Sequence, residues 1–333
     1  MIQPLVDFVG HPAEAIIASA AGVTSSQQWL LELRNLARKM TVSTDFPMPT
    51  IRQCAAVETA ISDDSNALLE FYVWLASGCL TTAFVMTQRS AALRRIETSE
   101  NEFARNMLLA AIRSGTSFAT VGISHLTTSR RHLSQAPLRA TKVSSGWVLE
   151  GFSPWVTGGQ YADWLVIGAV EENHSVGAQV PTKPNELLFS IPRDRSGVIV
   201  EPSSDLMALN ASSTGPVRFE NVAVVHEELL HGPIANVIET SNRKATRVGS
   251  QGTGSGPGGL QTSALAIGHA AQAIEYLVRE SQEREDIRNV AEGLQNQWRA
   301  VFDNLTQMNR GIGQQDQGIL RKKANDLALN STQ

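Results

Sequence analysis

The residue pair best placed to bind a flat ligand in this chain is Trp155 and Thr157. They lie in the run 152–157, which ends at Gly158 and Gly159. Residues two apart in a β-strand point to the same face of the strand. The pair therefore offers one ligand an apolar ring and a hydroxyl group, as the dimethylbenzene and pyrimidine edges of a flavin require. The structural alternative is a core Trp at a strand end and a Thr that merely favours strand structure.

The sequence around this pair extends the pattern on both sides. Ala162-Asp163 follows the glycines and opens an apolar run that predicts a strand over 164–170. Upstream, a helical pattern ends near Gly115 and leads into the apolar run 119–124. Downstream, 209–224 reads as a turn followed by a further strand. Several short strands separated by turn residues predict a small barrel or sandwich.

Taken together, these segments resemble the acyl-CoA dehydrogenase superfamily. The residues 155–163 resemble its motif W-I-T-N-G-x-x-A-D, and 119–124 resembles its strand that leads into a Thr-Glu-Pro motif. The segment 209–224 matches the strands that close its β domain. The resemblance runs from about Leu68 to about Tyr276.

The resemblance implies FAD as the cofactor and an acyl thioester as the substrate. It places the flavin ring against Trp155 and Thr157, and against Val121, Ile123 and Ser124, with Ser124 supplying a second hydroxyl. It further implies a homodimer or a homotetramer. The expected reaction is an FAD-dependent oxidation of a CH–CH bond.

Several residues depart from the superfamily pattern. His125 and Leu126 stand where Glu and Pro are usual, and 278–285 lacks the usual R-x-x-F-G. Gln261 stands where some members carry the catalytic Glu, and an amide cannot act as a base. Most members carry the base in a loop after the last helices, whereas this sequence ends in a helical pattern before such a loop, so we expect the C-terminal bundle to be incomplete. No catalytic residue is assigned.

Two other functions fit these departures. A flavin-dependent monooxygenase of the same fold needs no base to remove an α-proton, so Gln261 would be harmless and His125 could assist a flavin hydroperoxide. A non-catalytic chain that keeps the β domain as an assembly module is the second alternative.

Hydrophobic periodicity predicts three domains, at 1–115, 116–235 and 236–333. The expected fold class is α+β, with an N-terminal helical domain, a middle antiparallel β-barrel or sandwich, and a C-terminal helical bundle. Asp64 is the expected N-cap of the third helix, and Thr98 or Ser99 that of the fourth. Predicted helices cover 27–39, 50–61, 65–88, 100–113, 260–285, 289–310 and 317–333. Predicted strands cover 118–124, 138–143, 147–152, 164–170, 186–191, 197–201 and 217–224.

Bulk properties exclude some classes of protein. The net charge is −4 with acidic and basic residues interspersed, which argues against a nucleic-acid surface. Isolated Cys54 and Cys79 indicate a reducing, cytoplasmic location without disulfides. The N-terminus lacks the basic residues of a secretory signal. The apolar run 67–86 is long enough to span a bilayer, but Glu70 and Gly78 favour a buried helix instead.

Three further patterns could suggest a binding site, and each also has a structural explanation. The G-x-G-x-x-G match at 254–259 follows a polar segment, so we interpret it as a linker rather than a dinucleotide site. His226 and His231 are five residues apart, a spacing that would make them diverge on a helix, so we expect no metal site. On the helix from Leu260, Gly268 lies on a stripe that could face either a ligand or solvent.

Overall fold

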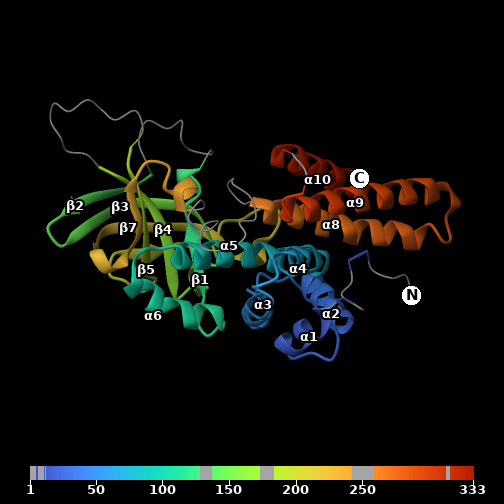
Figure 1. The fold of residues 1–333 in the computed structure, drawn as a ribbon, viewed down its shortest axis with the longest axis horizontal. Coiled ribbons are helices and arrows are strands. Elements are labelled where there is room, and N and C mark those ends of the chain that lie inside the picture. Colours follow the sequence, from blue (N-terminus) through green and yellow to red (C-terminus); the bar gives the residue numbers. More distant parts are fainter. Residues whose placement is uncertain are drawn as a thin grey trace. The chain divides into compact units, whose positions relative to one another are not determined.

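The computed structural model describes residues 5–6, 11, 13–127, 137–172, 184–241, 259–312 and 316–333. The contacts divide the chain into two compact units, shown as a ribbon in Figure 1. One unit comprises Met1–Asp45, Pro49–Thr87 and Gly258–Gln333, and the other comprises Phe46–Met48 and Gln88–Pro257. The three domains expected at 1–115, 116–235 and 236–333 stay a prediction.

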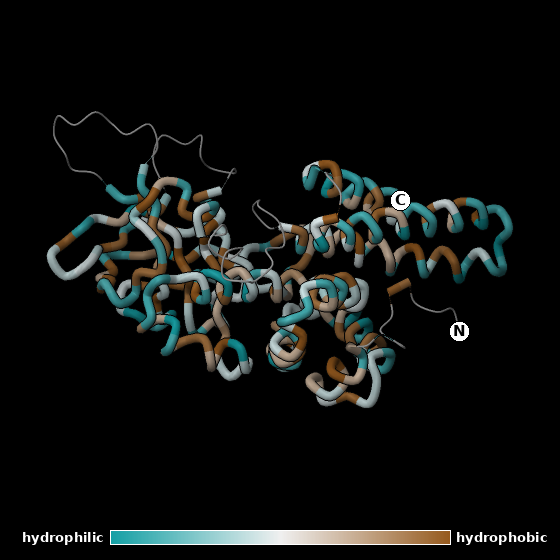
Figure 2. Tube along the Cα trace, viewed as in Figure 1, coloured by the Kyte–Doolittle hydropathy of each residue, from teal (hydrophilic) through white to brown (hydrophobic). Residues whose placement is uncertain are grey.

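The first unit is helical. Its helices α8 and α9 are amphipathic and bury one face each, and Figure 2 shows hydrophobic and hydrophilic residues alternating along them. The helix α4 is instead buried on all sides over 71–78. The helix 14–21 has no counterpart in the sequence prediction. The helices are α1 (Glu14–Ala21), α2 (Ser26–Lys39), α3 (Met48–Ala60), α4 (Ser65–Gly78), the first part of α5 (Leu80–Glu97), α8 (Gly259–Glu280), α9 (Arg288–Asn309) and α10 (Gln317–Thr332).

The single helix expected over 65–88 is two helices. Cys79 has φ −148° and ψ 101°, which is extended backbone, so α4 ends at Gly78 and α5 begins at Leu80. The predicted cap is confirmed, because the Asp64 side chain accepts hydrogen bonds from the backbone N–H groups of Asn66 and Ala67. Within the described residues, no helix is long and apolar enough to cross a bilayer.

The close approach of α8 to α4 corrects the interpretation of the Gly268 stripe. A Cβ at Gly268 would lie 2.2 Å from the Val73 carbonyl oxygen and 2.7 Å from the Ala76 Cβ. The glycine therefore makes room for the backbone of α4, and a neighbouring helix, not a ligand, occupies the space that its missing side chain leaves.

The α8 helix is further tied to α2 by a buried ion pair. The Arg34 Nη2 lies 2.5 Å from the Glu275 Oε2, and the Leu5 backbone N–H donates to the Glu275 Oε1 at 2.8 Å. Replacing Glu275→Gln keeps the size of the side chain but leaves the Arg34 charge without a counter-charge. We expect this variant to lose about 1–3 kcal/mol of unfolding free energy.

Urea denaturation followed by circular dichroism measures this loss. The matched control is Glu285→Gln, because Glu285 is exposed and its Oε1 lies 3.8 Å from the Arg288 Nη1. This control is expected to change the unfolding free energy by less than about 0.5 kcal/mol. Equal effects of the two substitutions would contradict a stabilising role for the buried pair.

The two cysteine thiols lie in the helical unit, and both are buried. Burial raises the pKa of the Cys79 thiol, against a smaller opposing effect of its hydrogen bond with the Thr82 hydroxyl. Native protein should therefore react with a thiol reagent at least about a hundredfold more slowly than protein in urea. Rapid labelling of either thiol in the native protein would show that this packing opens readily.

The second unit is built on a mixed sheet, which within the described residues has eight strands. The order is β6-β7-β3-β2-β4-β5-β8, and β1 also pairs with β4. Both β1 and β2 run parallel to β4, whereas the other pairings are antiparallel. The strands are β1 (Ala119–Gly122), β2 (Leu138–Val143), β3 (Gly146–Thr157), β4 (Trp164–Glu171), β5 (Glu186–Pro192), β6 (Val198–Val200), β7 (Thr214–Val225) and β8 (Leu229–Ile234).

The expected α+β fold class is confirmed, although the sheet is mixed rather than wholly antiparallel. The strand β8 has no counterpart among the predicted strands, the last of which covers 217–224. Its Leu230 backbone carbonyl accepts a hydrogen bond from the Ser99 hydroxyl at 2.7 Å. Ser99 is therefore not the expected helix cap, and Asn101 caps α6 (Glu102–Arg113) instead.

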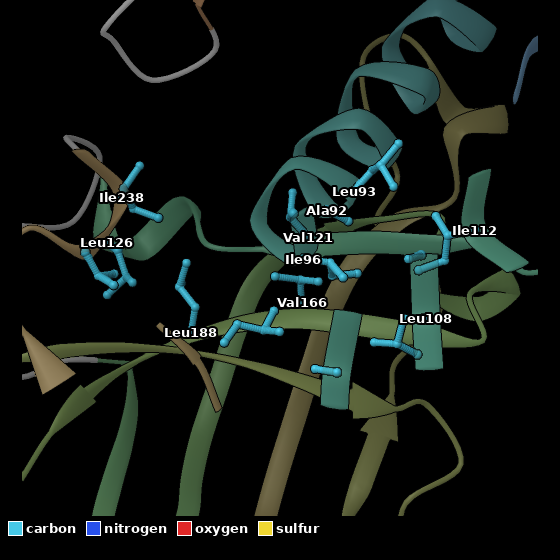
Figure 3. Packing of buried hydrophobic residues seen from close by; sticks show 14 residues of the cluster. Ala92, Leu93, Ile96, Leu108, Ile112, Val121, Leu126, Val166, Leu188 and Ile238 are labelled. Carbon is cyan, nitrogen blue, oxygen red and sulfur yellow. The ribbon is translucent and has the colours of Figure 1, made fainter. Parts of the chain in front are cut away.

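Two helical segments cover one face of this sheet, as Figure 3 shows. The C-terminal part of α5 contributes Ala92 and Ile96, and α6 contributes Leu108 and Ile112. These side chains pack against apolar residues of β1, β4, β5 and β8. This core fixes β1, which carries the predicted flavin contact Val121 and leads directly to the predicted contacts Ile123 and Ser124.

Candidate functional site

The strand β3 carries Trp155 and Thr157 at its C-terminal end. Ser153 pairs with Val217 and Val156 pairs with Gly215, so two residues of β3 stand opposite one residue of β7. This extra residue is a β-bulge, and the lack of an N–H on Pro154 suits that position. Because Trp155 lies in the bulge, regular strand alternation does not extend from it to Thr157.

The two side chains differ in exposure. Trp155 is 45% exposed, whereas Thr157 is 4% exposed. The Trp155 indole is therefore not buried in the core of the sheet, and part of it is open to a ligand. Single exposed hydrophobic residues are ordinary on protein surfaces, so this exposure makes the indole available to a ligand and does not by itself assign one.

The Thr157 hydroxyl belongs to a cluster of buried hydroxyl groups. Its Oγ1 lies 2.9 Å from the Thr214 Oγ1, which lies 2.8 Å from the Ser212 Oγ. The backbone carbonyl of Thr157 accepts a hydrogen bond from the Thr120 hydroxyl at 2.7 Å. Thr157 is thus held through its side chain by β7 and through its backbone by β1.

The turn after Thr157 requires glycine. Gly158 has φ +67°, and a Cβ there would lie 2.9 Å from ring atoms of both Phe46 and Phe118. Its N–H lies 3.0 Å from the carbonyl oxygens of Ser212 and Ser213. The turn therefore anchors the end of β3 to the segment that supplies the hydroxyl cluster.

The strand β1 and the residues directly after it hold the other predicted contacts. Val121 pairs with Val166 of β4, and its side chain lies in the core under α5 and α6. Ile123 packs against the same core, and Ser124 begins the 3-10 helix η1 (Ser124–Leu126). The Val121 side chain is used for packing, so a ligand contact at this position would fall on the backbone.

The structure gives a physical reason for two departures from the superfamily pattern. The His125 Nε2 lies 2.8 Å from the Gly168 carbonyl oxygen, and because a carbonyl only accepts, this nitrogen carries the hydrogen. A Cβ at Gly168 would lie 2.4 Å from the Leu126 Cδ1. His125 and Leu126 therefore both pack η1 onto β4 at Gly168.

The structure brings the two predicted groups together. Besides the bond from Thr120 to Thr157, a Cβ at Gly122 would lie 2.7 Å from the Ser153 Oγ and 3.0 Å from the Val156 Cγ2. The end of β1 and the end of β3 are therefore neighbours. The flavin contacts assigned to Val121, Ile123, Ser124, Trp155 and Thr157 stay predictions. Sequence reasoning missed the supporting hydroxyls, although Ser212 and Thr214 lie within a segment that carried the resemblance.

A cavity of about 560 Å³ lies elsewhere in this unit. It is lined by residues that include Glu100, Glu227, His226 and Leu230, and by none of the five predicted flavin contacts. None of its described lining residues is Lys or Arg, so these residues offer no cation to the phosphates of FAD or of coenzyme A. Among the described residues, no three His, Cys, Asp or Glu side chains are grouped to hold a metal ion.

Gln261, which the sequence resemblance placed at the position of the base in some superfamily members, lies buried in the first turn of α8. Its position is thus well defined within the helical unit, but its amide gives it no basic function. Most of the glycine-rich match at 254–259 lies outside the described residues.

The fold of the chain is that of acyl-CoA dehydrogenases. A glutaryl-CoA dehydrogenase from Mycobacterium smegmatis, solved in complex with FADH2, matches with a TM-score of 0.75, 14% sequence identity, and coverage of 99% of this chain and 87% of that chain. Butyryl-CoA dehydrogenase from Megasphaera elsdenii matches with a TM-score of 0.68 and 18% identity, covering 92% and 85%.

The same fold also occurs in an oxygenase. A dibenzothiophene monooxygenase from Paenibacillus sp. A11-2 matches with a TM-score of 0.67 and 16% identity, covering 97% of this chain and 83% of that chain. No protein-family model and no curated protein matches the sequence. At these identities the likeness defines the fold, and the activity has to be argued from the site.

Proposed function

We propose that this chain is an FAD-dependent oxidoreductase, with the flavin ring lying against Trp155 and Thr157. The observation that carries the proposal is the half-exposed indole of Trp155, two residues before Thr157, which two neighbouring strands hold in place. The presence of FADH2 in one protein of the same fold supports it.

The residues present fit such a group. A flavin is a flat ring with an apolar edge and a polar edge, and a partly exposed indole offers the apolar edge a stacking surface. The Thr157 hydroxyl offers the polar edge a hydrogen-bonding group. Ser124 at the start of η1 supplies a second hydroxyl on the neighbouring strand end.

The proposed reaction is dehydrogenation of a CH–CH bond in an acyl thioester. When bound, FAD supplies the hydride acceptor, and the protein binds and orients the substrate and excludes water. The support is the fold, which glutaryl-CoA and butyryl-CoA dehydrogenases share. The base that removes the α-proton is not assigned, and a homo-oligomer and a cytoplasmic location stay predictions.

A flavin-dependent monooxygenase is the second candidate. Gln261 favours it, because oxygen activation at a reduced flavin needs no α-proton base. The occurrence of the fold in a dibenzothiophene monooxygenase supports this candidate, because one fold can host several activities. The buried His125, which is hydrogen-bonded to Gly168, gives this candidate no additional support.

Two assays separate these candidates from each other and from a non-catalytic chain. Anaerobic addition of acyl-CoA should bleach the visible absorbance of the flavin if the protein is a dehydrogenase. Oxygen consumption on addition of externally reduced flavin and an aromatic substrate, with no bleaching by any acyl-CoA, would favour the monooxygenase. Protein that remains colourless after incubation with FAD would contradict both.

A further inference from the structure

The three side-chain hydroxyls of Ser212, Thr214 and Thr157 form a continuous chain. The Oγ atoms of Ser212 and Thr214 are 2.8 Å apart, and those of Thr214 and Thr157 are 2.9 Å apart. All three residues are buried. Burial removes competition from water, so each hydroxyl depends on its neighbours for hydrogen bonds.

The three hydroxyls can donate their hydrogen bonds along the row in either of two directions. Thr214 has one hydroxyl hydrogen, so it can donate to only one of its two hydroxyl neighbours while accepting from the other. If Thr214 donates to Thr157, the Thr157 hydrogen is available for a ligand. If Thr157 donates to Thr214, the Thr157 oxygen is available to accept from a ligand. Either direction preserves both bonds.

We propose that these three hydroxyls form a reversible relay, which lets Thr157 hydrogen-bond to a bound flavin in both of its redox states. The inference rests on the proposed function. A flavin ring nitrogen accepts a hydrogen bond in the oxidised state and carries a hydrogen, which it can donate, in the reduced state. The hydroxyls meet both needs by rotating about their C–O bonds, and each keeps its own hydrogen, so no covalent bond forms or breaks. Thr214 and Ser212 are positioning residues.

Removing the middle hydroxyl tests the relay. In Thr214→Val, the Thr157 hydrogen has lost its acceptor and is left unsatisfied whenever the ring nitrogen donates to Thr157. The variant should therefore weaken binding of reduced FAD relative to oxidised FAD by about tenfold. That ratio corresponds to a reduction potential lowered by about 30 mV for a two-electron couple. The potential is measured by equilibration with a reference dye.

Two further variants control for packing. Thr214→Ser keeps the hydroxyl and should restore the wild-type potential. Thr120→Val removes an equally buried hydroxyl beside Thr157, but that hydroxyl donates to a backbone carbonyl, which cannot reverse its role. It should affect both redox forms alike and leave their ratio unchanged.

The outcomes separate the relay from the proposed function. Wild-type protein that binds no flavin would overturn the proposed function and the relay with it. Flavin binding with the same potential in wild type and Thr214→Val would overturn the relay alone. A shift of equal size in Thr120→Val would also overturn it, because the effect would then follow from packing.

Discussion

Replacing Gly268→Ala should destabilise the helical unit by about 3 kcal/mol or more, because it forces a methyl group into the backbone of α4. The new Cβ would lie 2.2 Å from the Val73 carbonyl oxygen, 2.7 Å from the Ala76 Cβ and 3.1 Å from the Ser77 nitrogen. None of these atoms is the end of a flexible side chain, so only a shift of a whole helix can relieve the overlap.

The control is the same substitution in a neighbouring helix of the unit. Gly293 lies in α9, is exposed, and has nothing within 4 Å of an added Cβ. Gly293→Ala should stabilise the protein by about 0.5–1 kcal/mol, because alanine favours helix more than glycine. The urea midpoint monitored by circular dichroism compares the variants. A Gly268→Ala midpoint equal to that of wild type would show that α4 and α8 do not pack as closely as described.

Replacing Trp155→Ala should weaken FAD binding by about ten- to a hundredfold, because the flavin loses its stacking surface. Because the indole is about half exposed, the same change should alter the thermal midpoint little. Trp155→Phe, which keeps an aromatic ring, should lose less affinity. Fluorescence titration of FAD measures the dissociation constants.

Phe103→Ala supplies the matched control for loss of an exposed aromatic ring. Phe103 is 58% exposed on α6 in the same unit, and it is not among the predicted flavin contacts. Its removal should leave the dissociation constant for FAD unchanged. If Trp155→Ala and Phe103→Ala weaken binding to the same extent, the indole has no special place in the site.

The sequence was most informative where local chemistry decides the structure. The strand predicted at 138–143 has those bounds in the structure, and Asp64 caps α4 as expected. The prediction of a single helix over 65–88 was wrong because hydrophobic periodicity continues across Cys79, where the backbone becomes extended. Periodicity reports which residues are apolar and not where the hydrogen-bonded ladder breaks.

Tertiary pairing explains what the sequence could not supply at the candidate site. Trp155 and Thr157 were predicted from their spacing and the motif around them, but the bulge at Trp155, which breaks the assumed alternation, depends on pairing with β7. Thr120 and Thr214 are far from Thr157 in sequence and meet it only because β1 and β7 lie beside β3. Gly268 was ambiguous because a helical stripe shows which residues share a face and not what packs against it.

The account depends most on whether the end of β3 holds a flavin. A titration of the wild-type protein with FAD, followed by flavin fluorescence beside the Trp155→Ala and Phe103→Ala variants, tests this most directly. We predict saturable binding of one FAD per chain, weakened by Trp155→Ala and unaffected by Phe103→Ala. Wild-type protein that shows no saturable binding, or binding that is indifferent to Trp155, would contradict the account.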